Sequence, residues 1–517
     1  MGQIGFVQGF LGGVIADEPR AALIGRDILS AGGTAADAAI AVGFALSVTY
    51  PSAASLGGGG VCIIRDNRTK MTETLEFLAP APAAALSTAT RPSAVPAMPR
   101  GLFALHAKYG RLPWPQLVTP AEQIARFGTP LSRALADELQ PVGEALLQDM
   151  ESRRVFFNAA TGRLVREGDR IVQVDLAATL GNIGRRAGPG EFYAGPLAQQ
   201  VVNAAREAGG SLSLDDLRSY APRWRETVEV PFDNAILHFA PPPSAAGTVE
   251  AQMAAMLIEA VSYERASTQD RPHLLIEAGK RAFAERDQWF VPANADTVQK
   301  DRVQAAYARR LMSTYRVDRA TPPTDLGLTG DPRPENPSAT NVVVFDREGS
   351  AVACNFTMNN QFGIGRIARG TGIMLAAMPG QYGGGPRSLG PVLLVNHNSN
   401  KVFAAGVASG GATAPMALTQ VMLDVLVGKK SVDEAIAAKR LHHGGRPDLV
   451  FFEQGMDEAL VRGLVGRGHR VAATPVIGRV SFAYCRNGIP TSSTALQDIC
   501  AMKSDPRVFG LSSSAAR

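Results

Sequence analysis

The sequence predicts a layered α/β protein in which helices pack over both faces of a sheet. The run NVVVFD at 341–346 is almost continuously apolar, which is typical of a strand covered on both faces. The run AADAAIAVGFALSV at 35–48 would place apolar residues on most sides of a helix, so this helix should be buried too. With 517 residues, 45% of them hydrophobic, the chain is long enough to bury several such layers.

The first part of the chain is expected to be mainly helical. Residues 19–31 have helical spacing and stop at a Gly-Gly pair, and Thr34 is placed to cap the next helix. Four consecutive glycines at 57–60 lead into a short strand at 61–64. Their spacing favours a loop with unusual backbone angles over a close approach of the backbone to another group.

A change of pattern separates this part from the rest. Ser213 is placed to cap a helix that begins at Leu214, and the rigid turn PPPSAAG (241–247) precedes a long apolar helix at 248–262. The stretch 318–338 is rich in Pro, Gly, Asp and Thr, which predicts an exposed, irregular connection.

Strands dominate after this connection. Residues 341–346 and 351–357 flank a turn and predict a β-hairpin. Further strands are expected at 391–396, 401–407, 449–453 and 481–487, and helices at 415–427 and 432–441.

Composition argues against several kinds of partner. Charged residues make up only 19% of the chain, the net charge is +5 and the arginines are spread out, so we expect no nucleic-acid partner. No apolar run reaches the roughly 18 residues of a membrane span, so we expect no membrane partner. The cysteines have no metal-ligand spacing and most lie in apolar runs, which favours reduced, buried thiols. These are Cys62, Cys354, Cys485 and Cys500.

Common cofactor and catalytic motifs do not fit. The glycines at 363 and 365 lack a third glycine at the right spacing and a surrounding βαβ unit. There is no Gly-Lys-Ser/Thr loop and no Gly-x-Ser-x-Gly elbow. His442 and His443 are adjacent, and on a helix they would point about 100° apart, which does not suit a shared metal. We therefore expect no cofactor and no metal.

The order of the segments does fit one mechanism. An N-terminal-nucleophile hydrolase is made as a precursor, in which a Thr, Ser or Cys side chain attacks the preceding peptide bond. The freed residue then uses its own α-amine as the base for its side chain. The break must fall at the head of a core strand that a flexible segment reaches, and residues 336–346 have that layout.

Five segments in the right order resemble the motifs of the γ-glutamyltransferase (γ-glutamyltranspeptidase) family of N-terminal-nucleophile hydrolases. They are AGGTAADAAIA with PSAASLGGGGVCII, then GGSLSLDDLRSY, PPPSAAG, NPSATNVVVFDREGSAVACNFTMNNQFG, and ASGG at 408–411. The resemblance covers essentially the whole chain and implies an αββα sandwich, with two stacked sheets and helices on both outer faces. It also implies a large-subunit-like part, 1–338, and a small-subunit-like part, 339–517, that form one compact unit.

Several positions that this resemblance makes functional depart from the family pattern. The nucleophilic Thr falls on Ala339, which has no hydroxyl and is flanked by Ser338 and Thr340. The arginine that binds the α-carboxylate of the substrate falls on Leu78, and the acidic residue that binds its α-amine falls near Gly380. A pair of serines falls on Leu389 and Gly390. A carboxylate without its bidentate arginine loses affinity and orientation.

Other positions match the pattern. Asn359 matches a substrate-binding asparagine, and Gly410 and Gly411 match the pair whose N–H groups would hold an oxyanion. A tight turn before the following helix also explains these two glycines. Thr340 is the nearest hydroxyl that could act as nucleophile, after a cleavage shifted to the 339–340 bond. It could equally be an ordinary strand residue, because a shift of one residue reverses the face that a strand presents.

The resemblance leaves two main functions open. The first is an amide hydrolase or acyltransferase that acts on something other than a γ-glutamyl amide. Leu78 and Leu389 would then imply a less polar acyl group. Ala339 would be either the natural residue or a substitution that traps the uncut precursor. The second is a natural pseudoenzyme that binds a small molecule or a protein in the inherited cleft. A γ-glutamyltransferase that binds glutamate differently is a third, less favoured, reading.

The expected partner is a small-molecule amide substrate or ligand, and a homodimer is left open. The beginning of the sequence lacks the positive region of a signal peptide, which predicts a cytoplasmic protein, or a periplasmic one if a signal has been removed.

Overall fold

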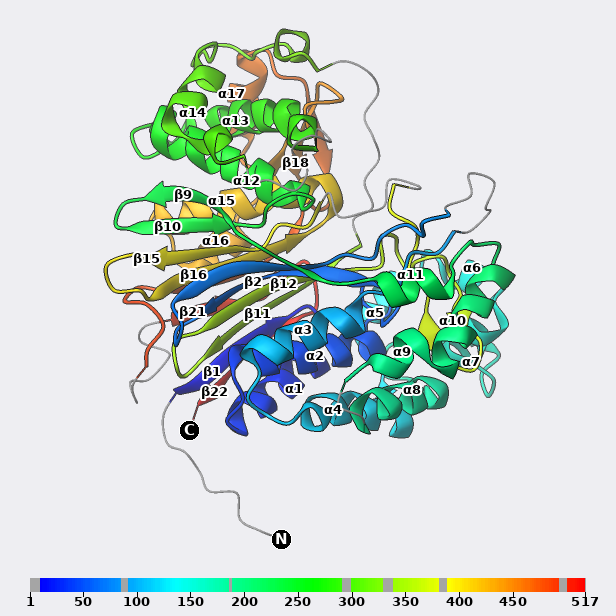
Figure 1. The fold of residues 1–517 in the computed structure, drawn as a ribbon. Coiled ribbons are helices and arrows are strands. Elements are labelled where there is room, and N and C mark those ends of the chain that lie inside the picture. Colours follow the sequence, from blue (N-terminus) through cyan, green and yellow to red (C-terminus); the bar gives the residue numbers. More distant parts are fainter. Residues whose placement is uncertain are drawn as a thin grey trace.

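Two antiparallel sheets lie face to face, and helices cover the outer face of each (Figure 1). The computed structural model describes residues 10–84, 92–185, 188–290, 299–328, 338–380, 388–491 and 500–516. This arrangement confirms the predicted αββα sandwich, a fold that the chain shares with solved structures of the same type.

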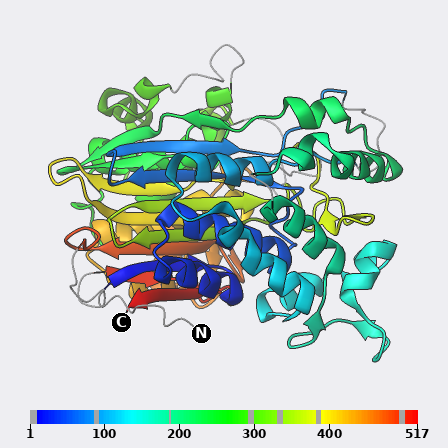
Figure 2. The ribbon, with the colours of Figure 1, turned by 60° about the horizontal axis from the view of Figure 1, so that its bottom comes forward.

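The first sheet has seven strands in the order β22-β1-β11-β12-β2-β3-β8. Their bounds are β1 Phe10–Ala16, β2 Gly59–Asp66, β3 Met71–Phe77, β8 Arg223–Arg225, β11 Thr340–Asp346, β12 Ala351–Thr357 and β22 Leu511–Ala516. The first and last of these along the chain, β1 and β22, lie side by side, as the blue and red arrows of Figure 2 show. Segments from both ends of the sequence therefore build one sheet.

The second sheet has six strands in the order β21-β20-β16-β15-β10-β9. Their bounds are β9 Val228–Phe232, β10 Ala235–Phe239, β15 Val392–Asn396, β16 Val402–Ser409, β20 Arg479–Cys485 and β21 Cys500–Lys503. This sheet also mixes strands from before and after the 318–338 connection, so neither side of that connection forms a complete sheet alone.

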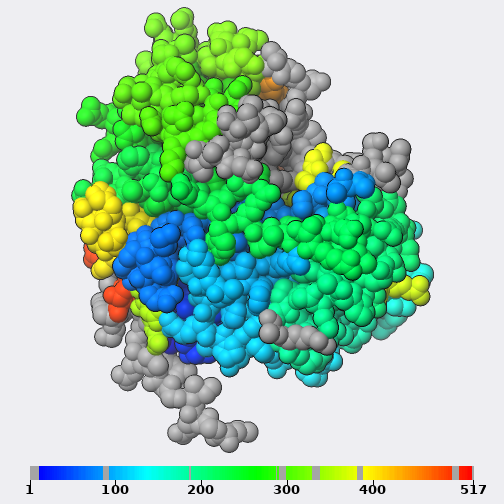
Figure 3. Space-filling model, in the orientation of Figure 1, coloured from blue at the N-terminus to red at the C-terminus, as the bar shows by residue number. Residues whose placement is uncertain are grey.

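The helices divide between the two outer faces. Below the first sheet in Figure 1 lie α1 Pro19–Ser30, α2 Ala35–Thr49, α3 Met98–Tyr109 and α4 Trp114–Phe127. A lobe beside them contains α5 Arg133–Leu139, α6 Gly143–Leu146, α7 Met150–Phe156, α8 Val174–Arg185, α9 Gly190–Ala194, α10 Pro196–Glu207 and α11 Leu214–Ser219. Above the second sheet lie α12 Ala245–Ala255, α13 Arg271–Glu285, α14 Ala305–Met312, α15 Ala414–Leu426, α16 Val432–Ala437 and α17 Glu458–Gly466. In the space-filling view, residues coloured blue to green cover most of the visible face, and the orange and red residues of the last part of the chain show only as small patches (Figure 3).

Shorter elements complete the fold. Two-residue strands form small ribbons at Thr129–Pro130 with Arg170–Ile171, Phe157–Asn158 with Arg163–Leu164, and Ile367–Ala368 with Ile373–Met374. A separate three-stranded sheet joins Leu441–His442, β18 Val450–Glu453 and Val471–Thr474. Short 3₁₀ helices lie at Arg286–Phe290, Lys300–Val303, Pro323–Leu326 and Gly411–Thr413.

Strand β11 lies between two apolar layers, and its side chains alternate between them. Val342 and Val344 pack with the helices under the first sheet, whereas Val343 and Phe345 pack into the space between the sheets. Ala339, directly before the strand, packs with this second group. The two-residue period of a strand therefore decides which way each residue at the head of β11 points.

Several sequence predictions need correction in detail. The helix expected at 248–262 is α12 followed by a π-helix, Met256–Ala260, and the helix expected at 432–441 ends at Ala437. Strands β1, β3, β8, β9 and β10 were not predicted. Of the predicted connection, residues 329–337 lie outside the described residues.

The glycines at 57–60 were interpreted wrongly. None of them has a positive φ. A Cβ on Gly59 would lie 2.3 Å from the Phe77 carbonyl oxygen, and one on Gly60 would lie 2.4 Å from that of Asn355. These glycines are needed because the backbones of neighbouring strands approach closely, not because of unusual angles.

The prediction of reduced cysteines is also wrong. Cys62 on β2 and Cys354 on β12 lie directly opposite each other and form a disulfide, with their Cα atoms 4.1 Å apart. Cys485 on β20 and Cys500 on β21 form a second one in the same way, with a Cα–Cα distance of 4.0 Å. The sequence could not show this pairing because 292 residues separate the first two cysteines.

We predict that the protein made in an oxidising compartment has no reactive thiol. Denatured without reductant, it should take up no iodoacetamide, because all four cysteines are paired; after reduction it should take up four adducts per chain. Mass spectrometry of the intact chain makes the measurement. Two adducts before reduction would mean that one pair is open, which would contradict the pairing.

Candidate active site

The position at which the resemblance expects a nucleophile is part of an apolar cluster. Ala339 is buried, with 1% of its surface exposed, and belongs to the cluster between the sheets. Leu389 is in the same cluster, and Leu78 packs against it. Three positions that were expected to carry polar groups for a γ-glutamyl substrate therefore present a methyl group and two leucine side chains to the same region.

Asn359 connects the neighbouring segments of this region. It follows β12 with a φ of +59°, and its side-chain amide donates to the carbonyl oxygens of Ala79 at 3.2 Å and Ala377 at 2.9 Å. These bonds tie the segment that contains Leu78 to the one that leads to Gly380. In this structure the Asn359 amide hydrogens hold the frame of the site.

Gly380 directly precedes residues 381–387, which lie outside the described part of the chain, and Gly390 comes three residues after them. Gly380 has a φ of +86° and open space around the position of a Cβ. Gly390 donates its backbone N–H to Oδ1 of Asn355 at 3.1 Å. Neither residue offers a side chain to a substrate.

The Gly410–Gly411 pair forms the junction between β16 and the 3₁₀ turn that begins α15. Both have positive φ, and a Cβ on Gly410 would lie 2.8 Å from Cα of Gly478. No hydrogen bond from either glycine N–H to another described residue is found. The N-terminus of α15, with its partial positive charge, follows directly. Backbone N–H groups at a helix N-terminus are the donors that an oxyanion site needs, and the oxyanion role of Gly410 and Gly411 stays a prediction.

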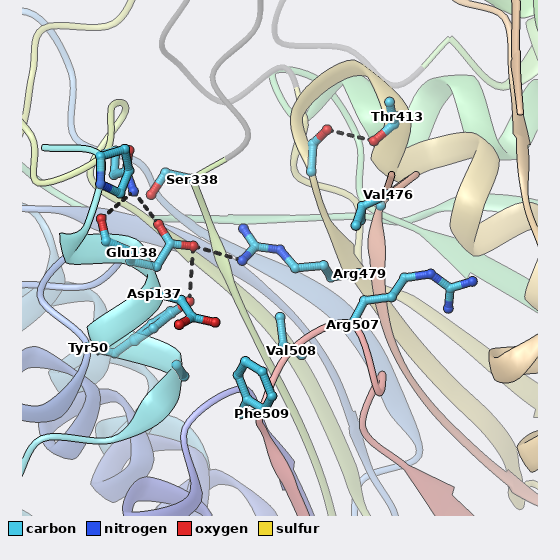
Figure 4. Close-up of a pocket in the computed structure, with 15 residues that line it drawn as sticks. Tyr50, Asp137, Glu138, Ser338, Thr413, Val476, Arg479, Arg507, Val508 and Phe509 are labelled. Carbon is cyan, nitrogen blue, oxygen red and sulfur yellow. Dashed lines mark hydrogen bonds and ion pairs between the residues drawn. The ribbon is translucent and has the colours of Figure 1, made fainter. Parts of the chain in front are cut away.

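A cavity of about 480 Å³ opens beside this junction, a volume typical of small-molecule sites (Figure 4). Its lining residues come from α5, from the start of β20 and from the connections around the strands: Tyr50, Ala134, Asp137, Glu138, Pro141, Ser338, Gln361, Gly410, Thr413, Val476, Gly478, Arg479, Arg507, Val508 and Phe509. Val476 and Phe509 are 45% and 41% exposed, which is high for apolar side chains. The rim of the cavity is therefore partly apolar.

An ion pair crosses one side of the cavity. Arg479 and Glu138 approach to 2.9 Å and point toward each other in Figure 4. The hydroxyl of Tyr50 and the side-chain amide of Gln361 also donate to the Glu138 carboxylate. Arg507, on the opposite wall, pairs with Glu453 and Asp505. Since carboxylates compensate both arginines, the cavity is not arranged to bind a strongly anionic group.

Thr340 lies on the other face of β11 from Ala339. Its hydroxyl donates to Oδ2 of Asp17 at 3.2 Å, and the side chain is completely buried. Asn341, on the same face as Ala339, bonds Ser409 and the backbone of Arg479, next to Gly410. The structure therefore brings Ala339 to the side of the glycine junction and places the Thr340 hydroxyl away from it, outside the lining of the cavity.

Asp17 is the carboxylate closest to Thr340, and its environment is unusual. Burial raises the pKa of Asp17 to about 6, although Arg479, the Asn341 N–H and the Thr340 hydroxyl act to lower it. Its second oxygen, Oδ1, is buried without a hydrogen bond in the described part of the chain. The Thr340–Asp17 pair resembles a hydroxyl and its base, but in this structure it is sealed inside the protein.

Ser338 carries the hydroxyl that does reach the cavity. Its side chain lines the cavity together with Gly410 and lies beside Glu138 in Figure 4. The hydroxyl donates to the carbonyl oxygen of Ser52 at 2.9 Å, and the Ser338 carbonyl oxygen accepts a bond from Thr357 at 3.2 Å. From the sequence alone, Ser338 is identified only as a neighbour of Ala339.

Among the described residues, one group brings possible metal ligands together. Side-chain atoms of His273, Glu277 and His469 lie within 4.8 Å of one another. The two imidazoles hydrogen-bond each other at 2.7 Å, and the Glu277 carboxylate is held by Lys280 and Arg281. The donor atoms already have protein partners, so this group is a buried polar network.

No local sequence pattern indicates the polar wall of the cavity. Glu138 and Arg479 are 341 residues apart, and Tyr50 is 88 residues from Glu138. Each lies in an ordinary helical or strand pattern, and only the pairing of β16 with β20 brings Arg479 to the glycine junction.

Comparisons with known proteins agree on the relationship. Residues 21–382 and 386–508 match the family model described as γ-glutamyltranspeptidase. The chain is 30% identical to the glutathione hydrolase proenzyme of Escherichia coli strain K12, over 90% of this chain and 87% of that protein. It is 28% identical to glutathione hydrolase 3 of Arabidopsis thaliana, over 89% of this chain and 78% of that protein.

Solved structures show the same fold. A cephalosporin acylase from Bacillus halodurans superposes with a TM-score of 0.82 at 24% identity, covering 99% of this chain and 97% of that one. A chain of the γ-glutamyltranspeptidase of Helicobacter pylori is 29% identical, with a TM-score of 0.55, and covers 62% of this chain and 95% of that one.

We predict that Asp17→Asn changes the pH dependence of stability. Between about pH 4 and pH 6 the folded protein keeps a proton on Asp17 that the unfolded chain releases, so this contribution to stability falls as the pH rises. The variant lacks this loss. Its free energy of unfolding relative to wild type should rise by at most about 3 kcal/mol from pH 4 to pH 6.5 and then stay level. Urea unfolding across this range makes the measurement, and a difference that does not change with pH contradicts the prediction.

Proposed function

This chain belongs to the γ-glutamyltranspeptidase family of N-terminal-nucleophile hydrolases, and we propose that it hydrolyses or transfers the acyl group of an amide other than a γ-glutamyl amide. The observation that supports this most strongly is the apolar cluster of Leu78, Ala339 and Leu389 at positions where a γ-glutamyl group would need polar partners.

The cost of burying an unpartnered charge supports this choice of substrate. An α-carboxylate held against two leucines and a methyl group would lose its water without gaining a hydrogen bond, which costs several kcal/mol. An aliphatic acyl group that enters the cavity would gain about 25 cal/mol for each Å² of apolar surface removed from water at its partly apolar rim. The compensated arginines of the cavity do not offer a replacement for the carboxylate clamp.

The chemistry that suits this frame is acyl transfer. A hydroxyl adds to the amide carbonyl carbon, and the Gly410 and Gly411 N–H groups hold the negative oxygen that forms. The amine leaves, and water or a second amine then releases the acyl group from the enzyme. The α-amine freed by chain cleavage would act as the base, as in other N-terminal-nucleophile hydrolases.

A natural pseudoenzyme is the second candidate, and the side chain at 339 favours it. Ala339 faces the region of the glycine junction but has no hydroxyl, so it can neither cleave the precursor nor attack an amide. In this reading the cavity binds a ligand that it does not transform.

The two disulfides favour an oxidising compartment. Such bonds form and persist in the periplasm and outside the cell, whereas cytoplasmic thiols are kept reduced. In the described part of the chain, no helix is long and apolar enough to cross a membrane. Of the two compartments that the sequence left open, we propose the periplasm.

We predict that the purified protein releases p-nitroaniline faster from hexanoyl-p-nitroanilide than from γ-glutamyl-p-nitroanilide. The expected difference in kcat/KM is at least about tenfold, because the apolar rim of the cavity, Val476 and Phe509, favours the aliphatic chain, while the arginines of the cavity are already paired and leave the γ-glutamyl carboxylate without a partner. Absorbance of the released aniline measures both rates in the same assay. A preference for the γ-glutamyl substrate would overturn the proposed substrate class.

We further predict that Ala339→Thr produces a chain that cuts itself before residue 339, because it restores a hydroxyl on the face of β11 that the glycine junction shares. The matched control is Ala339→Val, which adds nearly the same volume to the cluster but no hydroxyl, and should not be cut before residue 339. N-terminal sequencing and intact mass distinguish the products. If wild type is inactive on every anilide and Ala339→Thr turns them over, the pseudoenzyme reading is correct.

A further inference from the structure

One carboxylate in the lining of the cavity has no partner among the described residues. Asp137, on α5, is exposed, and its side chain makes no hydrogen bond or ion pair with any of them. The two cations closest to it along the chain and in the lining are engaged elsewhere. Arg133, one turn earlier on the same helix, pairs with Glu167 at 2.9 Å. Arg479 pairs with Glu138, the neighbour of Asp137, also at 2.9 Å.

The place of these two acids on α5 indicates that they do not stabilise the helix. The helix spans Arg133–Leu139, so Asp137 and Glu138 lie in its last turn. The C-terminal end of a helix carries a partial negative charge, which makes a carboxylate there unfavourable. Arg479 offsets this cost for Glu138. In the part of the chain that the structure describes, no cation does the same for Asp137.

The charges on the opposite wall of the cavity balance one another. Arg507 pairs with Glu453 at 2.5 Å and with Asp505 at 3.1 Å. Asp505 also pairs with the buried Arg440 at 2.7 Å, so this group holds two positive and two negative charges. Since the ion pair that crosses the cavity is neutral as well, the lining keeps the negative charge of Asp137.

Apolar groups lie at the same end of the cavity as this charge. The Phe509 ring faces α5, with the guanidinium carbon of Arg133 5.2 Å from the ring centre. Residues four apart share one side of a helix, so Asp137 lies on this side too, and Figure 4 shows it on the side of Val508 and Phe509. Thr413, next to the glycine junction, lies at the far end of the same view. The cavity therefore presents apolar surface and an available carboxylate at one end, and the glycine junction at the other.

We propose that this cavity binds a primary alkylammonium group, and that Asp137 is the residue that pairs with the cation. Such a group suits both features, because its charge is stabilised by the carboxylate and its methylene groups cover the apolar surface. Taken with the proposed function, on which this step rests, the pairing makes the substrate an amide that carries a free amino group, either on its acyl part or on its amine part.

Calorimetric titration of the full-length protein with three probes of equal chain length tests the pairing without any turnover. At low ionic strength n-pentylamine, which is protonated at neutral pH, should bind about threefold to tenfold more tightly than n-pentanol. Pentanoate should bind more weakly than either. About 1 M salt should remove most of the difference, because it screens an ion pair with an exposed carboxylate. Equal affinities for pentylamine and pentanol at low salt would overturn the proposal.

Substitutions at exposed positions show whether Asp137 is responsible. Asp137→Asn should bind pentylamine no more tightly than pentanol, and Asp137→Lys should prefer pentanoate. The matched control is Asp318→Asn, which removes an exposed carboxylate between α14 and the 3₁₀ helix Pro323–Leu326 and should bind like wild type. Thermal unfolding of each variant verifies that it is folded. If folded Asp137→Asn keeps the preference for pentylamine, the assignment of Asp137 is wrong.

Two substrate comparisons show which part of the amide carries the amino group. If it is the acyl part, 6-aminohexanoyl-p-nitroanilide should be hydrolysed faster than hexanoyl-p-nitroanilide. If it is the amine part, 1,5-diaminopentane should accept the hexanoyl group faster than n-pentylamine. Either preference should be about threefold or more in kcat/KM, and Asp137→Asn should lose it.

The outcomes separate this assignment from the proposed function. If hexanoyl-p-nitroanilide is hydrolysed but neither preference is found, Asp137 does not recognise the substrate and the amide chemistry stands. If no anilide is hydrolysed but pentylamine binding depends on Asp137, the proposed function lacks support and the cation site stands.

Discussion

Two buried asparagines join the sheets next to the candidate active site, and the geometry of the site depends on them. Asn355 on β12 donates to Oδ1 of Asn341 on β11 at 2.9 Å and to the Ala408 carbonyl oxygen on β16 at 3.0 Å. Asn341 in turn donates to the Ser409 hydroxyl and to the Arg479 carbonyl oxygen. The space between the sheets is otherwise largely apolar, so a slip of either strand would leave these amides unpaired, at a cost of about 1–3 kcal/mol for each group. The bonds therefore fix the head of β11 relative to the end of β16.

Because that register is fixed, the direction of each side chain at the head of β11 is fixed as well. Asn341 points between the sheets, so Thr340 must point into the helical layer, where Asp17 accepts its hydroxyl hydrogen bond. A one-residue shift that would turn Thr340 toward Gly410 would also bury Val342 and Val344 on the wrong side and break the asparagine bridge. This constraint explains why a threonine next to the expected position does not simply replace the missing one. A residue before the strand, such as Ser338, is not subject to the same alternation.

The sequence predicted the layers of the fold better than the details of the site. The hairpin of β11 and β12, the strands β15, β16 and β20, and the helix α15 follow from apolar runs and turn residues, which depend on local physics. The disulfides, the Arg479–Glu138 ion pair and the Asp17–Thr340 contact depend on segments that lie hundreds of residues apart, and no local pattern encodes them. The glycines at 57–60 show the same limit. Their number indicated that side chains are excluded there, but only the neighbouring strands show that the cause is close backbone contact.

The glycine junction argues that this cavity is built for chemistry and not only for a turn. Gly410 is required sterically, since a side chain would collide with Gly478, so its identity alone does not distinguish a turn from an oxyanion site. The place of the pair is more informative than its identity. Gly410 is half-buried and lines the cavity, so its N–H can be reached there by water or by a ligand. Here the Gly410 and Gly411 N–H groups find no acceptor among the described residues, while Gly410 lines a cavity that a ligand could enter. Donors left available beside a hydroxyl and the N-terminus of a helix are the arrangement that stabilises a negative oxygen during acyl transfer. Under the proposed function, the apolar residues at 78, 339 and 389 would alter which acyl group is accepted without removing this arrangement.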